Sequence, residues 1–333
     1  MTAVTTTSLS RRIGGLSDFQ AGASARPLAL SLALMRVVYA TRHQMALAVA
    51  DHHHRLSDTG LRMLMSVRLT EGAPLDLGTL AIEVGVTKAN ISRELQRMEE
   101  RGFLTRGEDP DDRRRIRVRT APHVDRLLSN AMLAVSESVS VSFTPLNTAE
   151  RLRLMELSHL IREPPGTAPD PRMADDRMRA VEELLPEVDL AWTRAALALG
   201  RAADNVRGAL DRSLQGTGLS FVAFHALARV TIIDGGDLAL PALVPELGVN
   251  RGNVSWILRG LETKGLIVRT RDPYDARRIR ARATRAGAAS VSELVPQLQA
   301  AGDAALSVLN RTRRSELSRL LGLLEADAVP IRG

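Results

Sequence analysis

The sequence has no cysteine, few aromatic residues and no long hydrophobic run. The absence of cysteine excludes disulfide bonds and thiol-based redox sensing, and it favours a reducing compartment, so we expect a cytoplasmic protein. No run of about 18 apolar residues occurs, which argues against a transmembrane helix. The N-terminal stretch "MTAVTTTSLSRRIGG" has no apolar segment behind its arginines, so it predicts a flexible tail and not a secretory signal.

Motifs of catalysis and cofactor binding are also missing. The chain has no glycine-rich phosphate loop, no His-Glu-x-x-His sequence, no nucleophile elbow and no Cys–His pair, so we expect neither an enzyme nor a bound cofactor. The histidine run in "DHHHR", residues 51–55, does not predict a metal site. Consecutive residues on a helix point about 100° apart, and a closed structural site usually needs four ligands.

The residues that are present indicate a folded, mainly helical protein. Apolar residues make up 44% of the 333 positions and are mostly leucine, alanine and valine, which favour helix, while charged residues make up 25%. The length suffices for two domains. The formal net charge is +7, and nearly every basic residue is arginine, whose planar fork suits phosphate and guanine edges. This balance favours a nucleic-acid partner.

The chain contains an internal duplication. A shift of 163 residues aligns 56–119 with 219–282 without a gap, and 25 of the 64 positions are identical. The stretch "EPPGTAPDPR" contains four prolines and cannot continue a helix, so it predicts a boundary between the copies. We therefore predict a tail at 1–26, a first copy at 27–162, a linker at 163–172 and a second copy at 173–333.

Each copy predicts the same order of elements. A long amphipathic helix comes first, at about 27–55 and 174–215, and short helices follow at 57–69 and 77–84, and at 220–232 and 240–247. The next helix has Thr87 or Asn250 as its N-cap and ends at Gly102 or Gly265. An Asp-Pro turn inside a β-hairpin follows, and two closing helices end each copy, at 122–138 and 147–162, and at 285–309 and 313–326.

The hairpins alternate apolar and basic residues. We expect Ile116, Val118 and Ile279 to face the domain, and the arginines to face outward: Arg115, Arg117, Arg119, Arg278, Arg280 and Arg282. Helix, turn, helix and basic hairpin together predict two winged helix-turn-helix domains in a mainly α protein. Residues 88–119 carry a charge of +3 and residues 251–282 carry +6, so the basic excess lies in these two segments. A helix suits the major groove of duplex DNA, and a basic hairpin suits phosphates or the minor groove.

Two stretches resemble the MarR family of bacterial transcription regulators. They are "VTKANISRELQRMEERGFLTRGEDPDDRRRIRVRT" and "VNRGNVSWILRGLETKGLIVRTRDPYDARRIRARATRAG", and they resemble the family's recognition helix, wing and Thr-x-x-Gly entry to the next helix. The resemblance implies sequence-specific binding of duplex DNA, with repression more common than activation. Family members are normally homodimers with one domain per chain, so we expect this chain to form an intrachain pseudo-dimer, with its flanking helices packed copy against copy. The first copy has "RTAPH" where the second has "RATRAG", so we expect its junction to lack one residue and the glycine.

The predicted DNA-contacting residues lie on the recognition helices and the wings. Asn90 and Asn253 either read adenine, contact phosphate or simply face solvent. Trp256 packs against DNA sugars or against the other copy. The full set is Lys88, Asn90, Ser92, Arg93, Arg97, Arg113, Arg114, Arg115, Arg251, Asn253, Ser255, Trp256, Arg259, Arg271, Arg277 and Arg278.

Two wing arginines of this set could instead form ion pairs with two wing aspartates. We expect Asp112 and Asp275 to pair with wing arginines and shape the turn, so Arg114 and Arg277 either contact DNA or serve those ion pairs.

The resemblance also implies a small, often aromatic, anionic effector bound between the dimer helices and the reader domain. Tyr39, His43 and Trp192 are the candidate residues, although core packing explains them equally well. Two other functions are consistent with the sequence, namely a protein-interaction module and an architectural DNA binder without sequence preference. Because the recognition helices differ, we expect a DNA site with two unlike halves.

Overall fold

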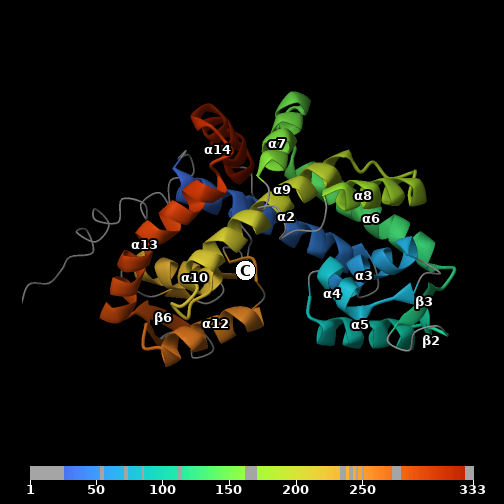
Figure 1. The fold of residues 1–333 in the computed structure, drawn as a ribbon, viewed down its shortest axis with the longest axis horizontal. Coiled ribbons are helices and arrows are strands. Elements are labelled where there is room, and N and C mark those ends of the chain that lie inside the picture. The colour runs from blue at the N-terminus through green and yellow to red at the C-terminus, as the bar shows by residue number, and fades with distance from the viewer. Residues whose placement is uncertain are drawn as a thin grey trace, which may run out of the picture. The chain divides into compact units, whose positions relative to one another are not determined.

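The computed structural model describes residues 26–52, 56–70, 74–84, 86–110, 115–161, 171–232, 238–239, 243–244, 247–249, 251–271 and 279–326 (Figure 1). Over these residues the protein is mainly helical with two small antiparallel sheets, as the sequence predicts. No helix in the described part is both long and apolar enough to cross a membrane. The helices are α2 (Pro27–His52), α3 (Asp58–Leu69), α4 (Leu77–Val84), α5 (Lys88–Glu100), α6 (Val124–Ser142), α7 (Thr148–Leu160), α8 (Pro171–Leu184), α9 (Ala191–Ser213), α10 (Phe221–Ile232), α12 (Arg251–Thr263), α13 (Arg285–Ala305) and α14 (Arg311–Ala326).

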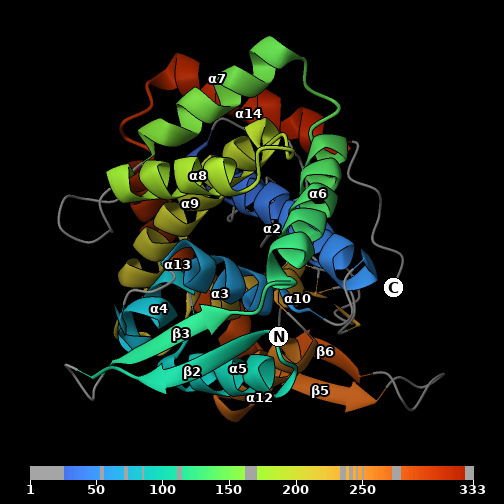
Figure 2. The ribbon, with the colours of Figure 1, turned by 90° about the vertical axis from the view of Figure 1, so that its right-hand side faces the viewer.

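The two sheets have three strands each. Strands β2 (Leu104–Glu108) and β3 (Ile116–Thr120) form the first hairpin, and β5 (Ile267–Arg271) and β6 (Ile279–Ala283) form the second. Figure 2 shows each hairpin projecting from its own helices. The sequence did not predict the third strands β1 (Pro74–Leu75) and β4 (Leu238–Ala239), which pair with β3 and β6. Two residues are too short for an alternation pattern, so only tertiary pairing defines these strands.

The helix predicted at 174–215 is wrong as a single element, because the chain leaves helical geometry between α8 and α9. Pro186 lies in this break, and proline removes a backbone donor and disfavours helix in the residue before it. Asp189 then accepts a hydrogen bond from the Ala191 amide at 2.9 Å at the start of α9. Pro186 was the feature of the sequence that could have predicted this break.

The sequence predicts an amphipathic helix at about 27–55. This prediction is wrong for the first half of α2, which is buried on every side. Leu28, Leu30, Leu32, Leu34 and Met35 are each at most 3% exposed. The side chain of the intervening Ser31 is also buried, and its hydroxyl donates to the Pro27 carbonyl at 2.7 Å. A helix that is enclosed all round serves as a core element.

The junction after the first wing has the same length as that after the second, which corrects the predicted missing residue. The Ala121 amide donates to the Phe103 carbonyl at 2.9 Å, and the Thr284 amide donates to the Leu266 carbonyl at 3.0 Å. The two donors are 163 residues apart, and so are the two acceptors. The register of the duplication therefore continues through this junction. The predicted loss of glycine is real, because Val124 stands at the position of Gly287.

Glycine is required at this position in the second copy, since a Cβ on Gly287 would lie 2.1 Å from the Leu266 carbonyl oxygen. Helix α13 begins two residues before Gly287, with Thr284 as its N-cap, whereas α6 begins only at Val124. The first copy therefore avoids the close approach by starting its helix later.

The chain divides into two compact units, and each contains parts of both copies. Unit 1 comprises Met1–His43, Ser142–Pro164 and Ala195–Gly333, and unit 2 comprises Gln44–Val141 and Pro165–Arg194. Within unit 1, α7 of the first copy packs on α14 of the second. Within unit 2, α8 packs on α3. The domain boundaries predicted from the sequence follow the duplication, and they stay a prediction.

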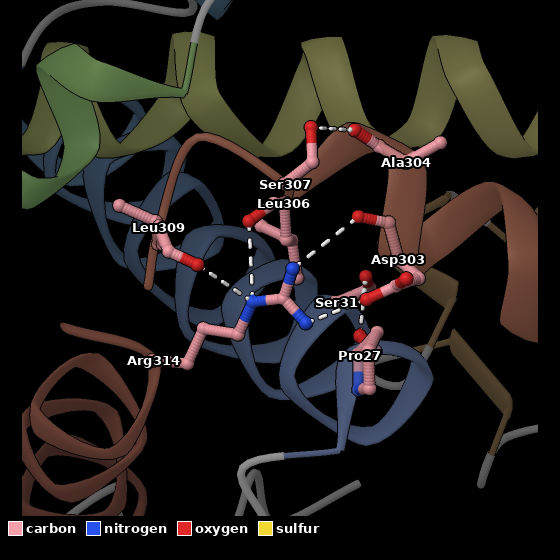
Figure 3. Close-up of polar contacts among 8 residues, drawn as sticks. All are labelled: Pro27, Ser31, Asp303, Ala304, Leu306, Ser307, Leu309 and Arg314. Atoms are coloured by element: carbon pink, nitrogen blue, oxygen red, sulfur yellow. Dashed lines mark hydrogen bonds and ion pairs between the residues drawn. The ribbon is translucent and has the colours of Figure 1, made fainter. Parts of the chain in front are cut away.

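Within unit 1 the start of α2 lies against α13. A Cβ on Gly302 of α13 would meet the Ser31 hydroxyl and the Leu28 amide at 3.4 and 3.5 Å. Figure 3 shows the turn that follows, where Arg314 Nε donates to the carbonyls of Leu306 and Leu309 at 3.2 and 2.9 Å. The same guanidinium donates to Asp303 Oδ1 at 2.6 Å, so Arg314 fixes the entry into α14.

We predict that His225 makes unit 1 sensitive to mild acid. Burial in α10, with the positive charges of Arg229 and Arg36 adding to it, lowers the pKa of His225 to about 3. Above pH 6.5 the imidazole is neutral in the folded and unfolded chain, so it contributes no pH dependence. As the pH falls from about 6.5, only the unfolded chain binds the proton, and stability declines by about 1.4 kcal/mol per pH unit.

Urea unfolding of the wild type and of His225→Leu at pH 7.5 and pH 5.0 measures this dependence. The wild type should lose more stability than the variant over this interval. The same loss in both proteins would show that another group causes the acid sensitivity.

Candidate nucleic-acid interface

Helix α5 presents one buried and one exposed face. Thr87 is its N-cap, as predicted, and accepts a hydrogen bond from the Asn90 amide at 3.3 Å. Ile91, Leu95 and Met98 are buried, so the apolar spacing predicted for this helix is confirmed. Gly102 follows the helix with φ +71°, a conformation that glycine adopts without the steric cost of a side chain.

The opposite face of α5 carries the predicted DNA-contacting residues. Lys88, Asn90, Arg93 and Arg97 are exposed, and Ser92 is half-buried. The Arg93 guanidinium donates to Asn90 Oδ1 at 2.6 Å, so these two side chains form one polar surface. Arg97 lies 2.5 Å from Glu94 Oε1 and also donates to the Ser57 hydroxyl, which connects the exposed face to the start of α3. The ion pair partly neutralises Arg97.

Helix α12 repeats the geometry with other side chains. Val254, Leu258 and Leu261 are buried, and Asn253, Trp256 and Arg259 are exposed, while Ser255 is half-buried. Trp256 is 74% exposed, which is unusual for so large an apolar side chain. Arg251 begins the helix, but its side chain and the predicted N-cap Asn250 lie outside the described residues. The predicted C-terminal Gly265 has φ +69° and is confirmed.

One ion pair connects each recognition helix to its wing, and it is the same pair in both copies. Arg106 Nε donates to Glu99 Oε2 at 2.7 Å, and the Arg106 amide donates to the other carboxylate oxygen at 3.2 Å. In the second copy, Arg269 Nε and its amide donate to Glu262 at 2.7 and 3.3 Å.

In each copy, the hydrogen bond from the arginine is the main cause that holds the pKa of the glutamate below its usual value. Each glutamate lies near the C-terminal end of its helix, and each arginine lies on the first strand of its hairpin. The pair therefore fixes the angle between helix and wing. Sequence reasoning missed this role, although both residues are identical in the two copies.

The first wing is described at its base. Val118 is buried and Arg115 and Arg119 are exposed, as predicted, but Arg117 is half-buried. Arg117 Nε donates at 2.8 Å to Asp109, whose carboxylate is almost completely buried. Asp109 therefore pairs with a wing arginine, a role that the sequence had suggested for Asp112. In the second wing Arg271 and Arg282 are exposed and Arg280 is half-buried. The tip residues Asp112, Arg113, Arg114, Asp275, Arg277 and Arg278 lie outside the described residues.

The three candidate effector residues do not share a unit. Tyr39 and His43 are half-buried on α2 in unit 1, whereas Trp192, also half-buried, belongs to unit 2. Burial raises the pKa of Tyr39. Its ring lies against Gly248, which has φ +62°, and a Cβ there would be 2.3 Å from Tyr39 Cγ. A side chain of the first copy thus contacts the turn that leads into the second copy's recognition helix.

We predict that Gly248→Ala destabilises unit 1 more than Gly265→Ala. Both glycines have positive φ, which costs alanine about 1–2 kcal/mol in either place. Only Gly248 has the Tyr39 ring within contact distance, whereas a Cβ on Gly265 meets open space. We expect the clash to add about 1–3 kcal/mol, measured by urea unfolding.

The double variant Tyr39→Ala/Gly248→Ala is the control for the clash. In the Tyr39→Ala background, Gly248→Ala should lower the free energy of unfolding by less than it does in the wild-type background. Equal losses for the two glycine variants would mean that the ring moves away freely and does not fix the turn.

Comparisons with known proteins identify both copies. Residues 56–116 match one MarR family model and residues 217–278 match a second. AbsC, a MarR family transcriptional regulator from Streptomyces coelicolor, is 19% identical over 32% of this chain and 72% of its own, with a TM-score of 0.30. BpsR of Bordetella bronchiseptica, whose DNA binding is regulated by 6-hydroxynicotinic acid, is 23% identical over 35% and 81%, with a TM-score of 0.32.

No curated protein sequence matches the chain. The two family matches carry the assignment. Each match includes a recognition helix and the first strand of its wing. The chain is therefore a tandem MarR-like protein, a transcription regulator with two winged helix-turn-helix domains.

Proposed function

We propose that one chain supplies both readers of a duplex DNA site and that the two halves of this site have different sequences. The observation that carries the proposal is the contrast between α5 and α12. Ile91, Leu95 and Met98 of α5 are equivalent to Val254, Leu258 and Leu261 of α12, and all six are buried and apolar. The ion pairs Glu99–Arg106 and Glu262–Arg269 are the same. Their exposed residues differ.

The differences fall where base edges would be read. Arg93 of the first copy is equivalent to Trp256 of the second, and Arg97 is equivalent to Gly260. Arginine recognises guanine by two hydrogen bonds, whereas tryptophan offers an apolar surface and a single donor. Asn90 and Asn253 are retained and exposed, and asparagine can form two hydrogen bonds with adenine. The two helices therefore share an exposed asparagine and differ at other exposed positions.

Repression is the proposed regulatory effect, because a protein that covers about two turns of DNA blocks access to a promoter that overlaps its site. The basic wings support phosphate binding beside each recognition helix. Arg115 and Arg119 are exposed on the first hairpin, and Arg271 and Arg282 on the second.

We predict one protected site of roughly 20 base pairs, with two unlike halves, after selection of genomic fragments near physiological salt and footprinting. The natural site should bind more tightly than a perfect palindrome of either half. Equal binding to both palindromes would contradict unlike readers. Binding that depends only on salt, without a preferred site, would favour the architectural alternative, and no DNA binding would favour a protein partner.

Arg259→Ala and Arg311→Ala form a matched pair for this measurement, since each removes one exposed arginine from unit 1. Figures 1 and 2 place α12, which carries Arg259, and α14, which carries Arg311, at opposite ends of that unit. Arg259→Ala should weaken binding by about 1–3 kcal/mol and relax the preference in one half-site only. Arg311→Ala should leave the preference unchanged.

Release by a small aromatic acid is the proposed means of control. Tyr39 supports it, because its ring contacts the turn before α12 and its displacement would change the position of that helix. A ligand shifts this equilibrium only if it binds more tightly to the displaced state. We predict that an acid that releases the wild type from its site fails to release Tyr39→Ala. Equal release of both proteins in a fluorescence anisotropy titration would place the effector elsewhere.

A further inference from the structure

Helices α7 and α14 occupy equivalent positions in the two copies. Asn147 caps α7 by accepting the Glu150 amide at 3.0 Å, and Asn310 accepts the Arg313 amide at 2.9 Å at the start of α14. Arg151 Nε donates to the Leu146 carbonyl at 2.5 Å, as Arg314 does to Leu309 in Figure 3. Each of these pairs differs by 163 residues, so the register of the duplication extends through both helices.

The two helices contact each other through residues of opposite charge. Arg153 donates two hydrogen bonds to Glu316 Oε2, at 3.0 Å from Nε and 2.9 Å from Nη2. Arg153 and Glu316 are themselves equivalent positions, so an approximate two-fold axis relating α7 to α14 passes between them. Away from this axis, Arg319 donates to Glu150 Oε1 at 2.8 Å.

The charges at three pairs of equivalent positions are reversed between the copies. Glu150, Arg153 and Glu156 on α7 correspond to Arg313, Glu316 and Arg319 on α14. The apolar residues do not distinguish the copies, since the buried Leu154 and Leu157 correspond to the buried Leu317 and Leu320.

Pairing of like copies would bring like charges together. If α7 met a second α7 in the same geometry, Arg153 would face Arg153 and Glu150 would face Glu156. If α14 met a second α14, Glu316 would face Glu316 and Arg313 would face Arg319. Like charges at such distances oppose association, whereas the pairing in this chain is attractive at the same positions.

We infer that α7 and α14 form a charge-coded pairing surface whose partner is the opposite copy, and which disfavours association of chains through like copies. Each ion pair is partly exposed and contributes little alone. Selectivity is a difference between two pairings, however, and here every attractive pair of one arrangement becomes a repulsive pair in the other. The tether within one chain further favours the intrachain partner over the opposite copy of another chain. The inference does not depend on DNA binding.

The test uses four full-length chains, namely the wild type, Arg153→Glu, Glu316→Arg and the double exchange. Arg153→Glu creates the Glu–Glu pair of an α14 self-pairing, and Glu316→Arg creates the Arg–Arg pair of an α7 self-pairing. Urea unfolding at low and high salt measures their stability. Each single reversal should lower the folding equilibrium constant of unit 1 by roughly two- to tenfold at low salt, and high salt should reduce this loss.

The double exchange should recover most of the stability that the single reversals lose. Arg126→Glu and Glu137→Arg, at exposed positions of α6, control for the change in net charge. The charge code is overturned if the double exchange loses as much stability as the two single reversals together. It is also overturned if the control variants lose as much stability as the single reversals. A DNA-binding failure with intact coupling would contradict only the proposed function.

Discussion

The first half of α2 is apolar on every side, and the arrangement of unit 1 depends on enclosing it. A helix with an exposed polar stripe can lie on a surface, but this segment has buried side chains at successive positions around its axis, so other elements must surround it. Most of unit 1 comes from the second copy. Arg36 of α2 also pairs with Glu325 at the end of α14, at 2.8 Å. The first copy therefore contributes both the buried half of α2 and α7 to a unit that comes mostly from the second copy, so unit 1 combines residues of both copies.

The winged helix-turn-helix elements were largely predictable because their signals are local. Alternating arginines, an Asp-Pro turn and helix-ending glycines each act within a few residues, and duplication repeated every signal. The resemblance implied that flanking helices of the two copies pack against each other, but the elements that cover α2 were not predictable, because its run of leucines shows that the helix is buried but not what covers it. The partners of Glu99 and Glu262 were equally hidden. Identity between the copies marked these residues, but only the folded structure shows that a wing arginine reaches each carboxylate.

The duplication divides the residues into those that build each winged helix and those that distinguish the two copies. Positions that set the angle of a recognition helix are the same in both copies, including the glycine after the helix and the ion pair to the wing. Positions on the exposed faces of α5 and α12 have changed, as Arg93 and Trp256 show. A changed exposed residue leaves the fold intact, because it removes no buried contact, whereas a changed ion pair alters the geometry of helix and wing together. The exposed residues of the two helices can therefore diverge while the geometry of helix and wing is retained.

Fusion of the copies also permits a contact that a symmetric dimer cannot form. In a homodimer, a residue on the two-fold axis meets its own copy, so an arginine there meets an arginine and a glutamate meets a glutamate. Arg153 and Glu316 occupy such equivalent positions and form an ion pair because one chain can change each copy separately. Arg153 donates to Glu316 at 2.9 Å and to Glu156 at 3.0 Å, and these hydrogen bonds raise the pKa of Arg153 above its usual value. The duplicated helices α7 and α14 thus differ in charge at the equivalent positions where they meet, as α5 and α12 differ on their exposed faces, and both differences follow from the same duplication.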